Sequence, residues 1–372
     1  MTEHSNMDPV FQNILRNASD AGASDIHLKA GAQIIYRIDR QLRPVESEHP
    51  SDAWLRAVLD TIAPAHLREA FAAGHEIDFA FAVDGLGRFR TNAFQQRGQI
   101  ALALRLVKGV IRNFAQLNLP DTIRRVAESP RGIVIVAGAI GSGKSTTLAA
   151  MIDHINRTAR KHIITLEDPI EYLFDDGQSL IDQREIGLDT ASFAHGLRHV
   201  LRQDPDVIVI GEMRDAESAM AAMSAANIGH LVITTLHTSD AMQSVQRVIE
   251  FFPNEQRDYA RQLFASTLRS VVCQRLVSSS NVGVLPALEI LINNVGVTKA
   301  IESNQTDKLP GIMDLGSNEG MQTFDFALRA LVAANKITRE EAMSHAANPE
   351  NLRMSFQGVS LNESNRIMGS RR

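Results

Sequence analysis

The chain has 372 residues, enough for two or three domains, and its 44% hydrophobic and 22% charged content is that of a globular protein. The formal net charge of −5 argues against a strongly basic surface for nucleic acid. With one cysteine, Cys273, the chain has no internal disulfide and no site built from several thiolates. It shows neither a secretion signal nor an apolar run of membrane-spanning length, so we expect a cytoplasmic protein.

The first part of the chain predicts a small α/β domain over residues 1–107. Apolar spacing predicts helices, and alternation of apolar and polar residues predicts strands. The expected helices cover 10–21 and 51–73, and the expected strands cover 24–28, 34–38, 77–83, 87–94 and 99–107. Gly109 and Pro120 interrupt the pattern, so we expect a linker over 108–120.

The second part predicts a parallel sheet in a domain over residues 121–349, because strand and helix patterns alternate there. The expected strands cover 133–137, 162–166, 207–210 and 231–235, and the helices between them cover 144–156, 192–202 and 216–227. Beyond residue 255 the pattern is helical, with one more strand expected at 285–292. Residues 350–372 are polar and lack periodicity, which predicts a mobile tail.

A glycine-rich loop after the first of these strands fits the pattern G-x-x-x-x-G-K-[ST]. Glycines allow successive backbone N–H groups to turn toward phosphate oxygens, and the following helix points its positive end at the same place. Lys144 is then expected to hold the β- and γ-phosphates, and Ser145 to bind Mg²⁺. The expected phosphate-binding residues are Gly138, Ala139, Ile140, Gly141, Ser142, Gly143, Lys144, Ser145 and Thr146.

Two acidic segments follow predicted strands of the same sheet. Glu212 comes after the strand at 207–210, where Mg²⁺ or an attacking water has to lie beside a phosphate loop. Glu167 and Asp168 follow the strand at 162–166 and precede Pro169, which disfavours a helical conformation at Asp168. Both segments predict groups that orient water or a metal ion, and a solvated or capped loop is the plain alternative.

Basic side chains are placed where they could meet phosphates. Arg198 and Arg202 share one helix face, and Arg90 and Arg105 lie on neighbouring predicted strands of the first domain. Arginines can act as fingers that reach a transferring phosphoryl group. A solvated surface remains the alternative for each of them.

His237 follows the strand at 231–235, where a polar residue can sense a γ-phosphate; a structural histidine is the alternative. His195 and His199 have the helical spacing of a metal pair, but the sequence offers no clearly placed third ligand.

These segments together resemble the secretion-type ATPases, and most closely the type IV pilus retraction motors. The resemblance covers roughly residues 7 to 350 and does not depend on the phosphate loop alone. Its other phrases, which occur in the family's order, are Ala-Ser-Asp-Ile-His-Leu-Lys at 23–29, Gly-Arg-Phe-Arg at 87–90, Leu-Glu-Asp-Pro-Ile-Glu-Tyr at 166–172, Gly-Glu-Met-Arg-Asp at 211–215, and a segment from Gly229 to Thr238.

The resemblance implies a PAS-like first domain and a RecA-like second domain with helices after it. It also implies a homohexameric ring that binds ATP and Mg²⁺ between the two domains. The implied catalytic acids are Glu212 and Glu167, and Ser145 and Glu212 are the implied Mg²⁺ residues. The implied nucleotide-binding residues outside the loop are Asp168, His230, His237, Arg90, Arg105, Arg198 and Arg202.

The expected partner is the inner-membrane platform protein at the base of the pilus, which would hold the motor at that membrane from the cytoplasmic side. Assembly motors of the family carry a four-cysteine zinc site and a further N-terminal domain, and neither is seen here, which favours retraction. The charged C-terminal segment of the main retraction motors is largely lost at 296–303, while the Phe-Phe-Pro phrase at 251–253 and the long tail favour the accessory type.

Four alternatives stay open at this stage. The first is an accessory, weakly hydrolysing subunit that acts with a paralogous retraction ATPase. The second is a related type II secretion-type ATPase, and the third is a nucleotide-gated regulator that does little work. The fourth, a nucleic-acid translocase, is disfavoured by the acidic net charge and the lack of a basic, aromatic-rich strip.

Overall fold

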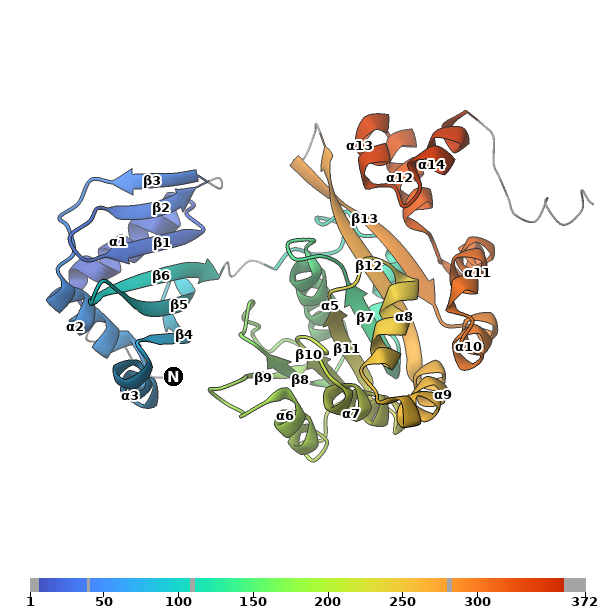
Figure 1. Ribbon diagram of the computed structural model, residues 1–372, viewed down its shortest axis with the longest axis horizontal. Helices are drawn as coiled ribbons and strands as arrows, with labels where there is room; N and C mark the ends of the chain where they lie inside the picture. The colour runs from blue at the N-terminus through green and yellow to red at the C-terminus, as the bar shows by residue number, and fades with distance from the viewer. Residues whose placement is uncertain (1–6, 39–40, 108–110, 280–282, 358–372) are drawn as a thin grey trace, which may run out of the picture. The chain divides into compact units, whose positions relative to one another are not determined.

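The computed structural model describes residues 7–38, 41–107, 111–279 and 283–357 (Figure 1). The chain divides into two compact units, Met1–Val110 and Ile111–Arg372. No helix in these described ranges is long and apolar enough to cross a lipid bilayer.

The N-terminal unit is one antiparallel sheet with helices on one face. Its strands are β1 (Asp25–Lys29), β2 (Ile34–Ile38), β3 (Gln41–Val45), β4 (Glu76–Val83), β5 (Gly87–Gln96) and β6 (Gln99–Val107), in the order β3-β2-β1-β6-β5-β4. Phe11 and Leu15 of α1 (Pro9–Asp20) and Leu55 of α2 (Asp52–Ile62) bury their side chains with Phe89 of β5. This side of the sheet therefore forms the core of the unit.

Two features of this unit differ from the predicted elements. The helix expected over 51–73 is two helices, α2 and α3 (Ala65–Gly74), because the backbone at Ala63 is extended ahead of Pro64. The strand β3 was not predicted, and its exposed side chains and Pro44 are typical of a sheet edge.

The second unit is a seven-stranded sheet with helices on both faces (Figure 1). Its strands are β7 (Gly132–Ala137), β8 (His162–Glu167), β9 (Leu180–Glu185), β10 (Val207–Ile210), β11 (Leu231–Leu236), β12 (Leu268–Ser279) and β13 (Gly283–Ile292). The order is β13-β12-β7-β11-β10-β8-β9, and every neighbouring pair except β12–β13 is parallel. The mixed α/β fold class predicted from the alternating pattern is confirmed.

The two faces of this sheet have separate cores. Val134 and Val136 of β7 pack on the side that carries α4 (Asp121–Ala127) and α5 (Lys144–Thr158). Ile133 and Ile135 pack on the opposite side, which carries α6 (Phe193–Val200), α7 (Ala216–Asn227), α8 (Ala241–Glu250) and α9 (Arg257–Thr267). A sheet covered on both faces brings the carboxyl ends of its parallel strands to one edge, which is where ligands bind in such folds.

The C-terminal part continues the second unit. After the short helix η1 (Asn254–Gln256) and α9, strands β12 and β13 form a long hairpin, and β12 was predicted to be helical. The helices α10 (Val295–Glu302), η2 (Thr306–Lys308), α11 (Leu309–Leu315), η3 (Ser317–Glu319), α12 (Phe324–Ala333), α13 (Arg339–His345) and α14 (Pro349–Phe356) follow.

The ends of this unit also differ from prediction. Residues 350–356, expected at the start of a tail, belong to α14, which buries Leu352 in the core. Leu119 is buried, and Phe114 and Leu117 pack on the α5 side, so this part of the expected linker belongs to the second unit. The rest of both predictions, at 108–110 and 358–372, lies outside the described residues.

Candidate nucleotide-binding site

The glycine loop joins β7 to α5 at the carboxyl edge of the sheet. Gly138, Gly141 and Gly143 all have positive φ angles (149°, 79° and 88°), a conformation that side chains disfavour. Gly143 directly precedes α5, which has 15 residues, so the unpaired N–H groups and the positive dipole end of a long helix face the loop. This backbone fits a phosphate group.

Lys144 is folded back over the loop. Its Nζ donates to the carbonyl oxygens of Gly138 at 2.9 Å and Ala139 at 3.0 Å, and lies 3.5 Å from Nδ1 of His237. Burial lowers the pKa of Lys144, and the charge of Glu171 opposes that shift. The buried ammonium therefore satisfies itself with loop carbonyls, and a phosphate would offer it a stronger, charge-assisted partner.

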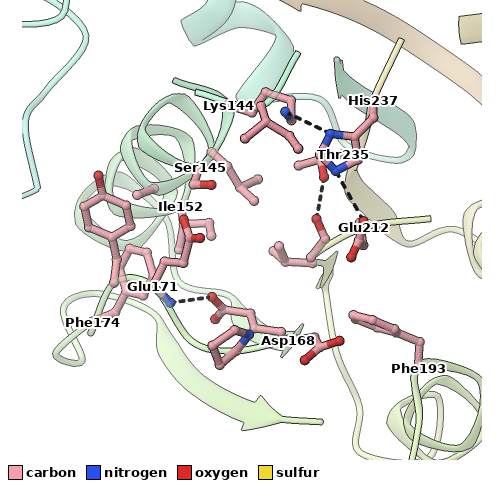
Figure 2. Close-up of a pocket in the computed structure, with 18 of the residues that line it drawn as sticks. Lys144, Ser145, Ile152, Asp168, Glu171, Phe174, Phe193, Glu212, Thr235 and His237 are labelled. Atoms are coloured by element: carbon pink, nitrogen blue, oxygen red, sulfur yellow. Dashed lines mark hydrogen bonds and ion pairs between the residues drawn. The ribbon is translucent and has the colours of Figure 1, made fainter. Parts of the chain in front are cut away.

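A cavity of about 230 Å³ opens beside the loop. Its polar lining comes from the start of α5, the ends of β8, β10 and β11, and the segment after β8, and its apolar lining comes mainly from α5 and the segment after β8 (Figure 2). The polar lining includes Lys144, Ser145, Glu167, Asp168, Glu171, Glu212, Thr235 and His237. The apolar lining includes Leu148, Ile152, Phe174, Phe193 and Val209, none of which was predicted.

A continuous polar chain crosses the cavity. His237 lies between Lys144 and Glu212, with its Nε2 3.4 Å from a Glu212 carboxylate oxygen (Figure 2). Burial, together with the charges of Lys144 and Arg214, lowers the pKa of His237 and so favours the neutral ring. A neutral imidazole can accept from Lys144 at Nδ1 and donate to Glu212 at Nε2.

Arg214 joins the two acidic segments. Its guanidinium forms an ion pair with Glu212 and lies 3.4 Å from Asp168. Thr235 donates to the carbonyl of Gly211 at 2.6 Å, which fixes the backbone just before Glu212. The Glu212 side chain is 18% exposed, so it borders the cavity while its backbone and carboxylate are held. Sequence reasoning did not single out Arg214, although it stands two residues from Glu212.

Glu167 lies deeper than Glu212. Its carboxylate accepts from Thr165 at 2.7 Å, from Gln183 at 3.0 Å and from the backbone of Glu171 at 3.4 Å. Burial raises the pKa of Glu167, while these donors oppose the shift. Because its lone pairs are largely used by the protein, Glu167 is suited to shaping the segment at 168–174 around the cavity.

The structure does not bring His230 to this site. His230 precedes β11 and its Nδ1 lies 2.9 Å from the Ala225 carbonyl, whereas His237 follows the same strand. Six strand residues extend roughly 20 Å, so the two ends are at opposite edges of the sheet. His230 therefore does not line the cavity, because β11 separates it from His237, and its contact with the nucleotide stays a prediction.

The other predicted residues of this unit that do not line the cavity are Gly138, Ala139, Ser142 and Gly143 of the loop, together with Thr146, Arg198 and Arg202. Thr146 lies on α5 with its hydroxyl 2.9 Å from that of Tyr172. Arg198 forms an ion pair with Glu217 on α7, and Arg202 lies exposed in the turn after α6. Their contribution to nucleotide binding stays a prediction.

Arg90 and Arg105 face each other across β5 and β6 of the N-terminal unit. Arg105 also forms an ion pair with Asp25 at 2.8 Å, and Arg37 lies 3.5 Å from the same carboxylate. Their charges lower the pKa of Asp25 against the opposing effect of burial, which is the largest single effect. The observed register of β5 and β6 places Arg90 and Arg105 on one face of the sheet.

The described residues contain no cluster of three or more histidine, cysteine or acidic side chains arranged to hold a metal ion. The rings of His195 and His199 lie 4.7 Å apart without a third ligand, so the pair carries no metal site among these residues. A magnesium ion bound with a nucleotide needs only one or two protein oxygens, because phosphates and water supply the rest.

Comparison with known proteins places the chain in a family. Residues 1–308 match the family described as type II/IV secretion system protein. The chain belongs to this family. It is 38% identical to the type IV pilus retractation ATPase PilT of Pseudomonas aeruginosa, over 91% of this chain and 98% of the relative. It is 37% identical to the type IV pilus ATPase PilU of the same organism, over 92% and 90%.

Two solved structures of related ATPases have the same fold as this chain. A crystal structure of the pilus retraction motor PilT with bound ADP superposes with a TM-score of 0.85 at 39% identity, covering 91% of this chain and 97% of that one. The Legionella pneumophila ATPase DotB gives 0.79 at 27% identity, covering 90% and 95%. The N-terminal domain followed by a RecA-like ATPase domain is therefore the fold of this chain.

Proposed function

We propose that this protein is an ATPase motor that hydrolyses ATP to power retraction of type IV pili. The observation that carries the proposal is the polar chain from Lys144 through His237 to Glu212, at the mouth of a phosphate-binding loop. A loop of this kind binds phosphates, and a carboxylate beside it can orient water for attack on the terminal phosphate. The similarity to PilT and PilU, over nearly the whole chain, supports pilus retraction as the work performed.

The residues around the cavity divide the work of binding phosphate and activating water. The backbone N–H groups of the loop and Lys144 hold the phosphates and offset the charge that develops as the terminal P–O bond breaks. Glu212 orients the attacking water and accepts its proton. His237 connects Lys144 with Glu212, so the position of the phosphate can be transmitted to the catalytic acid. Glu167 and Asp168 shape the wall that faces the terminal phosphate.

Mg²⁺ is proposed to be bound with the nucleotide, where it supplies charge neutralisation at the β- and γ-phosphates. The donors present fit that ion, because Ser145 and Glu212 both border the cavity and offer a hydroxyl and a carboxylate oxygen.

The assembly is proposed from the resemblance of the chain to its family. It is a homohexameric ring in which Arg90 and Arg105 of the N-terminal unit, and Arg198 and Arg202 of the second, reach nucleotide phosphates. The ring would act on the inner-membrane platform protein from the cytoplasmic side. The absence of a strongly basic net charge supports a protein partner rather than nucleic acid.

A second candidate is the accessory role, in which the chain hydrolyses ATP weakly and acts with a paralogous retraction motor. The sequence identities to PilT and PilU are nearly equal, which supports the accessory role as an alternative to the main motor. The ATPase rate of the purified ring, and pilus retraction in cells that lack the main motor, distinguish the two roles. Fast hydrolysis with retraction by this chain alone supports the main motor.

Glu212→Gln tests the catalytic assignment. The variant should still bind a fluorescent ATP analogue, while its rate of phosphate release should fall by about 10²- to 10⁴-fold, the usual contribution of a general base. Glu250→Gln on α8, an exposed acid outside the cavity, serves as the matched control and should keep the wild-type rate. Near-normal phosphate release by Glu212→Gln would show that Glu212 is not the group that orients and deprotonates the attacking water.

A further inference from the structure

Gln274 on β12 lies underneath the phosphate loop, although sequence analysis gave it no role. Its side chain is 3% exposed. The amide Nε2 donates to the carbonyl of Ser142 at 2.7 Å, and Oε1 accepts from the hydroxyl of Thr147 at 2.7 Å. One buried amide therefore joins the loop to the first turn of α5.

The same residue lies against both fixed glycines of the loop pattern. A Cβ on Gly138 would come within 2.5 Å of the Gln274 carbonyl oxygen, and one on Gly143 within 2.7 Å of its Nε2. A Cβ atom essentially never lies that close to an oxygen or nitrogen atom, so the glycines allow the loop to pack directly on Gln274. The requirement for glycine at these two positions comes partly from β12, which is more than a hundred residues away in the sequence.

Gln274 is buried, so water does not readily replace either of these hydrogen bonds. A buried amide that loses a hydrogen bond keeps its desolvation cost, so both bonds are held firmly. Because Ser142 and Thr147 flank Lys144 and Ser145, a link between them fixes the curvature of the stretch that carries the phosphate-binding groups.

We infer that Gln274 is a positioning residue for nucleotide binding: it touches no nucleotide, but it holds the phosphate loop in its binding conformation through Ser142 and Thr147. The inference rests on the proposed function, since it assumes that the loop binds a nucleotide. It predicts that changes at Gln274 raise the dissociation constant for Mg-ATP and the KM far more than they lower kcat.

Gln274→Glu is the sharpest test, because the carboxylic acid has the size and shape of the amide. When ionised, the new side chain can accept from Thr147 but places an acceptor against the Ser142 carbonyl, and a negative charge beneath a phosphate site. When protonated, it can donate to Ser142 as the amide does. Affinity for a fluorescent ATP analogue should therefore be at least about tenfold weaker than wild type at pH 8. Burial raises the pKa of an acid above its ordinary value of about 4.3, so the new side chain should take up a proton and the affinity should recover as the pH falls toward 5.

The control is Ser270→Ala, which removes another buried hydrogen bond of β12, from the Ser270 hydroxyl to the Leu291 carbonyl, away from the loop. It should leave affinity unchanged at both pH values. A role of Gln274 in core packing alone would lower thermal stability without a recovery of binding at low pH. Wild-type-like affinity of folded Gln274→Glu at pH 8 would overturn the inference.

Thr147→Val provides a second measurement should Gln274→Glu not fold. Thr147 is 1% exposed, and the change removes only the donor to Oε1. Weaker binding with an unchanged fold supports the inference, and unchanged affinity contradicts it. If the wild-type protein itself binds no analogue, the proposed function fails instead, so the two failures are distinguishable.

Discussion

At the scale of single residues, the site depends on contacts between its charged side chains and one histidine. Lys144, His237 and Glu212 form one chain, and Arg214 adds a cation at the end where Glu212 lies. The ring of His237 is therefore surrounded by two cations and one carboxylate. The protonation state of His237 therefore depends on the charges of Lys144, Glu212 and Arg214.

The pKa of His237 should lie below the ordinary histidine value of about 6.5. A depressed pKa means that the unfolded chain binds the proton more readily, so the stability contributed by the neutral ring is present above pH 6.5 and is lost as the pH falls. Arg214→Gln removes one of the charges that depress the pKa and should raise it. Titration of the isotopically labelled ring by NMR measures both values, and an unchanged or lower midpoint in the variant would contradict the arrangement.

Lys144→Ala removes the ammonium that faces the loop carbonyls and the phosphates. It should weaken binding of a fluorescent ATP analogue by at least about tenfold, because a charged hydrogen bond to phosphate contributes roughly 1.5–3 kcal/mol. Lys161→Ala, one residue before β8, is the control at a site outside the cavity. Binding as tight as wild type in Lys144→Ala would show that the loop is not the phosphate site.

At the scale of elements, Glu289 of β13 holds the starts of two helices. Its carboxylate accepts from the backbone of Ala241 at the beginning of α8 at 2.8 Å, and from that of Phe324 at the beginning of α12 at 3.4 Å. Burial raises the pKa of Glu289 to about 6. One strand residue thus ties a helix near the nucleotide site to a helix of the C-terminal group.

This raised pKa predicts a pH-dependent stability. The folded carboxyl binds its proton more tightly than the unfolded one, so its contribution is fully present below pH 4.5 and is lost as the pH rises through about 6. The loss is about 2 kcal/mol at 1.36 kcal/mol per pKa unit. Glu289→Gln cannot titrate, so its deficit against wild type should shrink by about 1.3 kcal/mol between pH 5, where part of the contribution is already lost, and pH 8 in urea unfolding. A deficit that is constant or grows with pH would contradict the assignment.

Much of the second unit could be predicted from sequence because its parallel strands are short apolar runs, and the loop glycines and the acids that end two strands are local signals. β12 was missed because Arg269, Ser270, Gln274 and Arg275 interrupt its apolar pattern. Gln274 and Arg275 are polar because they bond to distant loops, which no local pattern records. The apolar wall of the cavity was missed for the same reason, since Leu148 and Phe174 come together only in the fold.

At the scale of the whole second unit, β12 connects the nucleotide site to the C-terminal helices. Arg275 donates to the Ser239 carbonyl, two residues beyond His237, at 3.4 Å and to the His345 carbonyl of α13 at 2.5 Å. Its guanidinium also lies 3.9 Å from the centre of the Phe324 ring of α12. In Figure 1, the long β12–β13 hairpin runs alongside α12 and α13.

Arg275→Ala should loosen the C-terminal helices more than it affects the sheet. The lost contacts predict a destabilisation of about 2 kcal/mol, from a charged hydrogen bond and a cation–π contact. Hydrogen exchange should speed up in α12 and α13, with β7 and β11 unchanged. Arg329→Ala on α12, whose guanidinium lies 5.9 Å from the Phe326 ring, is the control and should leave exchange in α13 as in wild type. Equal hydrogen exchange rates in α13 of the two variants would show that Arg275 does not hold the C-terminal helices to β12.

The alternation along β12 limits how relatives can be recombined. Gln274 and Arg275 are consecutive, so their side chains point to opposite faces of the sheet, one toward the phosphate loop and the other toward the C-terminal helices. Inserting or deleting one residue upstream in β12 would exchange the two faces and separate both residues from their partners. A chimera that takes its C-terminal helices from another pilus ATPase should therefore be joined after Ile292, where β13 ends, and a junction that changes the length of β12 should yield a misassembled protein.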